Sequence, residues 1–126
     1  MGSTTRLLVV DDETEICDFL KEFFEERNYD VQTAYNGLDA LEKIKSHKPD
    51  VVLLDMMMPG MDGMAVLKEI KKDNPQTKVI MVTAVGTQDK INEALQLGAD
   101  NYVTKPLSLD YLEEDVKNKV SKLVKQ

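Results

Sequence analysis

Five short, mostly apolar runs alternate along this chain with five segments in which apolar residues recur at helical spacing. The runs cover residues 7–10, 31–34, 51–54, 79–82 and 102–103. The helical segments are marked by Ile16, Leu20, Phe23 and Phe24; by Leu38, Leu41 and Ile44; by Val66, Leu67 and Ile70; by Ile91, Ala94 and Leu95; and by Leu109, Leu112, Val116, Val120 and Leu123. Apolar strands that alternate with amphipathic helices favour a parallel sheet with helices on both faces. We therefore predict an α/β fold with a doubly wound five-stranded parallel sheet, since a barrel needs eight strands.

Turn-forming residues place the ends of several of these helices. The second helix is expected to begin near Asn36 and Gly37 and to end before Pro49. Gly98 stands where the C-cap of the fourth helix belongs. His47, the single histidine, is interpreted as an exposed C-terminal cap and not as a metal ligand.

Composition and charge exclude several classes of function. The 126 residues suit one domain with a sizeable core, and no apolar stretch approaches the ~20 residues of a membrane span. Lysine and arginine number 16 against 23 aspartates and glutamates, and the formal charge of -7 argues against direct nucleic-acid binding. The single cysteine, Cys17, cannot form an internal disulfide and is expected to be an inert, buried thiol. The start of the chain lacks the apolar region of a secretory signal, so we expect a cytoplasmic location.

Polar side chains that can carry chemistry follow the predicted strands. Asp11 and Asp12 follow the first strand, and Asp55 follows the third. Thr83 stands at the end of the fourth strand and Lys105 at the end of the fifth. Ligands of open parallel sheets bind outside the carboxyl ends of the strands, where the strand order reverses. In a sheet of order 2-1-3-4-5 the first and third strands are neighbours, and the three aspartates would crowd one end of the sheet.

Three clustered carboxylates need an offsetting charge. Two carboxylates ~4 Å apart repel by about 4 kcal/mol at an effective dielectric of ~20, against a total stability of ~5–15 kcal/mol. A hard divalent cation such as Mg²⁺ would offset this repulsion with oxygen ligands, and Lys105 would neutralise a further charge. A cation, a carboxylate nucleophile, a lysine and a hydroxyl together suit phosphoryl transfer through an aspartyl phosphate. The alternative is that the strand-end acids simply cap the helices that follow them.

Four motifs in this chain resemble those of one family. The segments LLVVDDE, VVLLDMMMPGMDG, VIMVTA and GADNYVTKP are together similar to the receiver domain of bacterial two-component response regulators, chemotaxis regulators among them. The resemblance spans about residues 5–124. It implies one receiver domain over that range, a flavodoxin-like (βα)5 fold with strand order 2-1-3-4-5, and a phosphorylation-dependent signalling switch.

The resemblance implies the phosphoacceptor and metal roles. Asp55 would accept a phosphoryl group from a sensor histidine kinase in a Mg²⁺-dependent reaction. Asp11 and Asp12 would form the acidic pair, with Asp12 a direct Mg²⁺ ligand and Asp11 acting largely through water. The Asp55 carboxylate and the backbone carbonyl of Met57 would be further ligands, and Mn²⁺ would substitute for Mg²⁺.

The resemblance also implies the residues of the switch. Thr83 and Lys105 would contact the phosphoryl oxygens, and Tyr102 would turn inward as Thr83 moves toward the phosphate. The Lys105–Pro106 peptide bond would be cis. The fourth helix, fifth strand and last helix, roughly residues 87–124, would form the surface that controls an output partner.

Variable positions beside the site bear on the lifetime of the phosphate. Met57 lies two residues after the phosphoacceptor and Val85 two residues after the threonine, at positions that tune hydrolysis in the family. Apolar side chains there would exclude or misplace the attacking water, so we predict a fairly long-lived phosphate. Met56 and Met58 are interpreted as core or turn packing.

Three other functions are weighed against this one. A constitutive binding module with the receiver fold usually lacks an acidic residue, the acceptor or the lysine, and this chain keeps them all. A phosphatase of the haloacid dehalogenase type would carry an Asp-x-Asp pattern after the first strand, where this chain has Asp-Asp-Glu. A flavodoxin would need a hydroxyl- and glycine-rich phosphate loop there.

The interpretation we favour is a receiver and not a metabolic enzyme. Such a domain takes phosphoryl groups from small donors as well as from its kinase, and hydrolyses its own acyl phosphate slowly. We expect a sensor histidine kinase and an unidentified output partner, with no nucleic acid and no membrane. Many receivers also form a dimer on phosphorylation.

Overall fold

The five predicted strands form one parallel sheet. The computed structural model describes residues 4–58, 60, 62–84 and 88–124. Its strands are β1 (Arg6–Val10), β2 (Asp30–Ala34), β3 (Val51–Asp55), β4 (Lys78–Thr83) and β5 (Asn101–Thr104). They lie in the order β2-β1-β3-β4-β5, and every neighbouring pair is parallel. The predicted doubly wound α/β fold is therefore confirmed.

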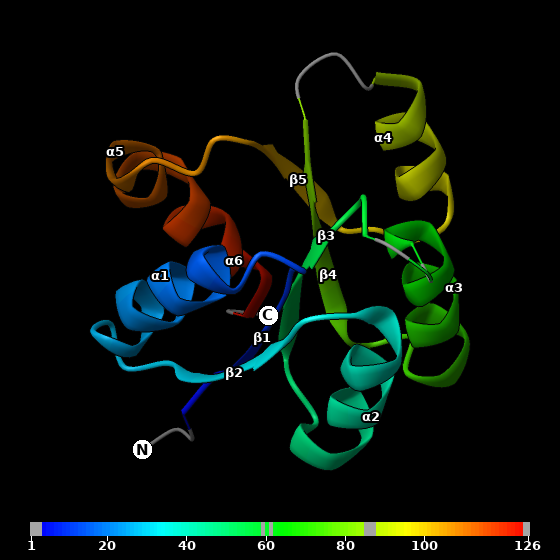
Figure 1. Cartoon of the computed structure of the whole chain (residues 1–126), viewed down its shortest axis with the longest axis horizontal. Helices are drawn as coiled ribbons and strands as arrows, with labels where there is room; N and C mark the ends of the chain where they lie inside the picture. The colour runs from blue at the N-terminus through cyan, green and yellow to red at the C-terminus, as the bar shows by residue number, and fades with distance from the viewer. Residues whose placement is uncertain (1–3, 59, 61, 85–87, 125–126) are drawn as a thin grey trace.

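Helices cover both faces of this sheet (Figure 1). One face carries α1 (Thr14–Glu25) and the last helix, and the other carries α2 (Gly37–His47), α3 (Gly63–Asp73) and α4 (Gln88–Gln96). The last helix consists of three consecutive segments, which are α5 (Leu109–Tyr111), the π-helical turn η1 (Leu112–Val116) and α6 (Lys117–Val124). Within the described ranges, no helix combines the length and the apolar character that crossing a membrane requires.

The alternation of side chains along the strands divides the core into two layers. Leu7 of β1 packs toward α1 and the last helix, whereas its neighbour Leu8 packs toward α2, α3 and α4. Both layers are apolar because helices bury both faces of the sheet. Met56 and Met58 are buried in the second layer, which confirms their interpretation as packing residues.

Cys17 of α1 is buried in the first layer. Its Sγ donates to the carbonyl oxygen of Asp11 at 3.3 Å. Burial, and after it the negative charge of Asp11, raises the pKa of the Cys17 thiol to about 12. The thiol is therefore protonated at neutral pH, as expected of an inert structural cysteine.

The interpretation of His47 as an exposed cap is wrong. α2 begins after Asn36, whose Oδ1 accepts the N–H of Asp39 at 2.8 Å. At its other end the cap residue is Lys48, which adopts a left-handed conformation with φ of 53°. His47 itself is half-buried, and its Nε2 is shielded from solvent. Arg6 of β1 donates to the carbonyl oxygen of His47 at 3.1 Å, which draws this end of the helix onto the sheet.

Three leucines that were predicted on buried helix faces are exposed. The exposed fractions are 72% for Leu38, 41% for Leu95 and 56% for Leu109. In α2 the buried face runs through Ala40 and Ile44, and Leu38 lies off this face at the first turn. Leu109 is the first residue of its helix and precedes the buried series. Spacing alone places the face of a helix only to within about one residue, because three and four both approximate its period.

The predicted C-cap at Gly98 is confirmed. Gly98 has a φ of 109°, and the N–H of Ala99 bonds back to the carbonyl oxygen of Ala94 at 3.0 Å. The N–H of Gly98 bonds to the carbonyl oxygen of Leu95 at 3.1 Å. These two bonds form a Schellman motif, which satisfies carbonyl groups at the end of α4.

Replacing Gly98 with alanine is expected to lower the free energy of unfolding by about 1–2 kcal/mol. The φ of 109° is strained for a residue with a side chain, and the new Cβ would lie 3.1 Å from Cγ of Lys71. Chemical denaturation measures the change, with Gln96→Ala in the same helix as a control expected within about 0.5 kcal/mol of wild type. Equal stabilities for the two variants would contradict the strain argument.

Candidate functional site

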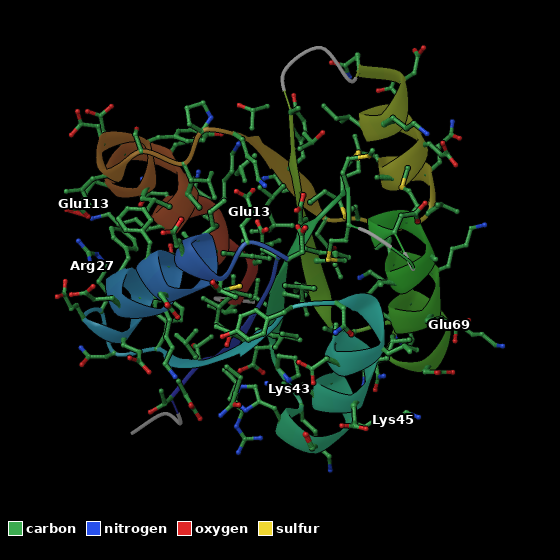
Figure 2. All side chains as sticks on the ribbon, viewed as in Figure 1. Glu13, Arg27, Lys43, Lys45, Glu69 and Glu113 are labelled. Carbon is green, nitrogen blue, oxygen red and sulfur yellow. The ribbon has the colours of Figure 1, made fainter. Side chains whose placement is uncertain are left out.

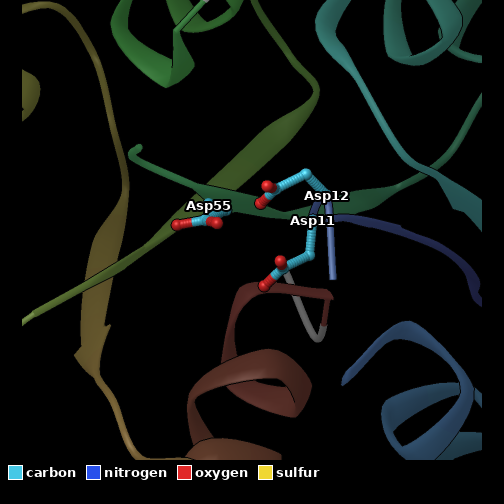
Figure 3. A group of neighbouring side chains, drawn as sticks. All are labelled: Asp11, Asp12 and Asp55. Carbon is cyan, nitrogen blue, oxygen red and sulfur yellow. The ribbon is translucent and has the colours of Figure 1, made fainter. Parts of the chain in front are cut away.

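Asp11, Asp12 and Asp55 come together at the carboxyl end of the sheet (Figure 3). β1 and β3 are adjacent, with Val10 opposite Leu54, so the residues at their ends meet at one edge. One carboxylate oxygen from each of the three aspartates lies within 4.8 Å of the others. The sheet topology thus assembles the cluster that the strand order predicts.

Asp55 is the last residue of β3, and its carboxylate is almost completely buried, with 4% of the residue exposed. Its Oδ1 accepts the N–H of Met57 at 3.3 Å, and its Oδ2 lies 3.4 Å from Nζ of Lys105. The following helix, α3, is capped by a different side chain, since Oδ1 of Asp62 accepts the N–H of Ala65 at 3.0 Å. Helix capping therefore does not explain the position of Asp55.

Asp11 is buried as deeply, and both of its carboxylate oxygens are engaged. Oδ1 accepts the N–H of Glu13 at 2.9 Å, and Oδ2 lies 3.2 Å from Nζ of Lys105. Glu13 is the N-cap residue of α1 and makes no side-chain capping bond. Asp12 is exposed and faces the same end of the sheet. Asp11 therefore fixes the turn before α1, while Asp12 presents its carboxylate to solvent.

Lys105 follows β5 and lies against three carboxylates. Its Nζ is 3.2 Å from Asp11, 3.4 Å from Asp55 and 3.5 Å from Glu13. Burial lowers the pKa of the Lys105 ammonium, but attraction to Asp55 and Asp11 outweighs it and raises the pKa above its ordinary value. Lys105 is therefore charged at neutral pH and offsets part of the repulsion in the cluster. The contact with Glu13 was not predicted, although Glu13 directly follows the acidic pair in the sequence.

The Asp55 carboxyl has a raised pKa. Burial, followed by repulsion from Asp11, raises the pKa of Asp55 from 3.8 to about 6, although Lys105 and the N–H of Met57 favour the charged form. At neutral pH the group is predominantly ionised, and its pKa lies close to the pH at which it would react. A carboxylate held in this way is a competent nucleophile.

Thr83 and Met57 lie next to Asp55. Thr83 is the last residue of β4, one position beyond Val82, which pairs with Asp55 across the strands. The Thr83 hydroxyl is buried and donates to Sδ of Met56 at 3.5 Å. Met57 is 68% exposed, and its backbone N–H points at Asp55. The strand ends therefore bring a hydroxyl group and a backbone amide close to the carboxylate cluster.

The predicted switch tyrosine and the predicted cis peptide bond lie on β5 and directly after it. Tyr102 is half-buried in β5 opposite Met81, outside the carboxylate cluster. The Lys105–Pro106 peptide bond is cis. Val85, which entered the prediction of phosphate lifetime, lies outside the described residues.

Residues 7–117 match the family described as response regulator receiver domain. The chain belongs to this family. Sporulation initiation phosphotransferase F of Bacillus subtilis (strain 168) is 41% identical over 112 residues, which are 89% of this chain and 90% of that protein.

Solved structures agree with this assignment. A CheY-like response regulator receiver domain protein from Methanospirillum hungatei JF-1 is 34% identical, with a TM-score of 0.87 over 98% of each chain. The receiver domain of Francisella response regulator 1452 is 37% identical, with a TM-score of 0.86 over 97% of this chain and 98% of that one. The fold and the signalling class expected from the motifs are thereby confirmed.

The acidic cluster of this receiver domain fits a hard divalent cation. Its three donors are carboxylates, which are the ligands that Mg²⁺ prefers, and they converge within 4.8 Å. Asp12 is exposed, so the cluster is open to solvent on one side and leaves room for the waters that Mg²⁺ usually keeps. No cysteine or histidine of the described residues joins the group, which disfavours zinc.

Gly63 positions the loop that follows Asp55, a role that the sequence did not reveal. It is the first residue of α3, and its N–H bonds to the carbonyl oxygen of Met56 at 3.0 Å. A Cβ at this position would lie 2.3 Å from the carbonyl oxygen of Asp55. The start of α3 therefore lies directly against the backbone that carries Asp55, which only glycine permits. A glycine at the first position of a helix that follows a strand-end aspartate was the available signal.

Proposed function

We propose that Asp55 accepts a phosphoryl group from a phosphohistidine of a sensor histidine kinase, and that the phosphorylated domain controls an output partner. The observation that carries this proposal is the buried, ionised Asp55 carboxylate among Asp11, Asp12 and Lys105. We further propose that the domain spans residues 5–124 and acts in the cytoplasm. The extent is supported by β1, which begins at Arg6, and by α6, which ends at Val124.

In the proposed transfer, an Asp55 carboxylate oxygen forms a bond to phosphorus while the bond between phosphorus and the donor nitrogen breaks. The electron pair of the broken bond goes to the imidazole of the donor. Asp12, Asp55 and the Met57 carbonyl would hold Mg²⁺, with Asp11 acting largely through water, and the ion would supply positive charge against the phosphoryl oxygens. Mn²⁺ is expected to substitute for it.

Lys105 and Thr83 serve the phosphoryl group in this proposal. Lys105 Nζ, now 3.4 Å from Asp55 Oδ2, is close enough to bind a phosphoryl oxygen once the acyl phosphate has formed. The Thr83 hydroxyl lies 3.5 Å from Sδ of Met56 and 3.4 Å from the carbonyl oxygen of Ala84. We expect it to donate to a phosphoryl oxygen once the acyl phosphate forms, because a charged acceptor makes the stronger hydrogen bond. Tyr102 then turns inward, and the surface of α4, β5 and the last helix changes.

Hydrolysis of the acyl phosphate is expected to be slow. The Asp55 side chain is 6% exposed, and the apolar side chain of Met57 stands two residues after it. We expect the apolar Met57 side chain to exclude or misplace the water that would attack phosphorus, although the cluster is open to solvent beside Asp12. The domain is therefore a signalling receiver that takes phosphoryl groups from a kinase or a small donor and holds them.

Intact-protein mass after incubation with acetyl phosphate and Mg²⁺ tests the proposal. Wild type is expected to gain one phosphoryl group, whereas Asp55→Asn, or wild type in EDTA, gains none. Asp110→Asn, which removes an exposed carboxylate at the start of the last helix, is the matched control and should react like wild type.

Two results would contradict the assignment. Gain of a phosphoryl group by Asp55→Asn would place the acceptor on another residue. No gain by wild type, either from acetyl phosphate or from a phosphorylated sensor kinase, would favour a constitutive binding module with the receiver fold.

A further inference from the structure

Side chains close the outer edge of β5. This strand is the last of the sheet and pairs only with β4, so an open edge would leave backbone groups without partners. The N–H of Thr104 donates to the hydroxyl of Tyr111 at 3.2 Å, and the carbonyl of Tyr102 accepts from Nζ of Lys119 at 3.1 Å. The N–H of Tyr102 donates to Oδ1 of Asn101 at 2.8 Å. Two of these three bonds tie β5 to the last helix.

Lys119 contacts Tyr102 in a second way. Its Nζ lies 5.6 Å from the centroid of the Tyr102 ring, within the range of a cation–π interaction. On its other side the same ammonium lies 3.4 Å from Oδ2 of Asp115, one turn earlier in the π-helical turn η1. The Lys119 side chain is 26% exposed, so its position is well defined by these three contacts.

Tyr102 links the Lys119 contact to the proposed switch. Its ring packs partly against the core layer under α4 and is otherwise accessible to solvent. The proposed switch carries the ring further inward from this half-buried position. Any such movement must weaken the cation–π contact with Lys119 and disturb the bond to the Tyr102 carbonyl.

We propose that Lys119 is a positioning residue for the switch, which holds Tyr102 in its half-buried position and so opposes activation. The inference rests on the proposed function, since it requires Tyr102 to move when Asp55 is phosphorylated. By linkage, a contact that favours the half-buried position disfavours phosphorylation by the same factor. Loss of one hydrogen bond from an ammonium group predicts a change of about fivefold.

The test uses the 126-residue chain labelled with fluorotyrosine, in which the fluorine NMR signal of Tyr102 is assigned with Tyr102→Phe. Beryllofluoride with Mg²⁺ is the phosphoryl analogue. Lys119→Gln removes the ammonium, and Lys119→Arg restores a cation. Lys117→Gln is the matched control, because Lys117 lies in α6 as well and pairs with Glu113 four residues earlier at 3.4 Å, as Lys119 pairs with Asp115. In the described part of the chain Lys117 makes no bond to β5.

The inference predicts that Lys119→Gln shifts the Tyr102 signal, before any addition, toward its position with beryllofluoride. It also predicts that Lys119→Gln binds beryllofluoride about fivefold more tightly, whereas Lys117→Gln and Lys119→Arg behave like wild type. If Lys119→Gln and Lys117→Gln have the same Tyr102 signal and the same affinity for beryllofluoride, this inference is overturned but the proposed function is not. A wild-type Tyr102 signal that does not move with bound beryllofluoride would overturn both the inference and the switch role of Tyr102, while phosphorylation of Asp55 stands on the mass measurement.

Discussion

Asp55→Asn is expected to raise the free energy of unfolding by about 2–3 kcal/mol at neutral pH in EDTA. The wild-type carboxylate is buried beside Asp11, and this environment raises the pKa of Asp55 from 3.8 to about 6. The folded protein therefore holds an ionised group in an unfavourable place. Asparagine has a similar shape and no charge, so the substitution removes this cost.

The difference in unfolding free energy between wild type and Asp55→Asn depends on pH with a definite sign. Because the folded-state pKa of Asp55 is raised to about 6, the folded state binds this proton more tightly than the unfolded state does. The stability of wild type therefore falls as the pH rises from about 4 to about 6, and the full cost is present above that window. The advantage of Asp55→Asn should accordingly disappear below about pH 4.

Urea unfolding across this pH range in EDTA measures the effect. Asp18→Asn, which removes an exposed carboxylate from α1, controls for the general change in net charge. Adding Mg²⁺ should stabilise wild type and narrow the gap to Asp55→Asn, because a cation that binds only the folded state adds to its stability. Two results would contradict the described electrostatics of the cluster. One is an Asp55→Asn variant that is less stable than wild type at neutral pH, and the other is a wild-type stability that does not change when Mg²⁺ is added.

The sequence predicted this cluster because its position follows from topology. Asp11 and Asp55 stand at the ends of apolar runs, and parallel strands bring their carboxyl ends to one edge. Backbone pairing between neighbouring strands then leaves little freedom for where the side chains lie. The same reasoning located Thr83 and Lys105, whose strands end at that edge.

The sequence pattern could not predict contacts between side chains of distant segments. Arg27 and Glu113 point toward one another from the end of α1 and from the last helix (Figure 2), at 2.7 Å. Charged residues are frequent in both segments, and nothing in their spacing selects this pair. Lys119 and Tyr102 meet only because α6 and the edge strand β5 lie in a particular relative position. The bond from Arg6 to the carbonyl oxygen of His47 is another contact that joins residues far apart in the sequence.

Gly63→Ala is expected to lower the free energy of unfolding by about 3 kcal/mol or more. The new Cβ would lie 2.3 Å from the carbonyl oxygen of Asp55 and 2.8 Å from Cα of Met56. Both are backbone atoms, so no rotamer change can relieve the overlap. Either the start of α3 or the end of β3 must move, and the bond from the N–H of Gly63 to Met56 is strained in both cases.

Gly60→Ala in the same loop is the matched control. Gly60 has a φ of 82°, but no described atom lies within 4 Å of the point that its Cβ would occupy. Alanine there therefore costs only backbone strain of about 1–2 kcal/mol. Urea unfolding should separate the two variants, and equal losses would contradict the role assigned to Gly63.

The Gly63 variant also links stability to function. Relieving the overlap in Gly63→Ala moves the backbone that carries Asp55. Phosphorylation by acetyl phosphate should therefore slow by about 100-fold, even under conditions in which the variant is folded. Gly60→Ala leaves that backbone in place and should react close to the wild-type rate. A folded Gly63→Ala that reacts as fast as wild type would show that the loop adapts without moving Asp55. The close approach of α3 to β3 would then serve packing alone.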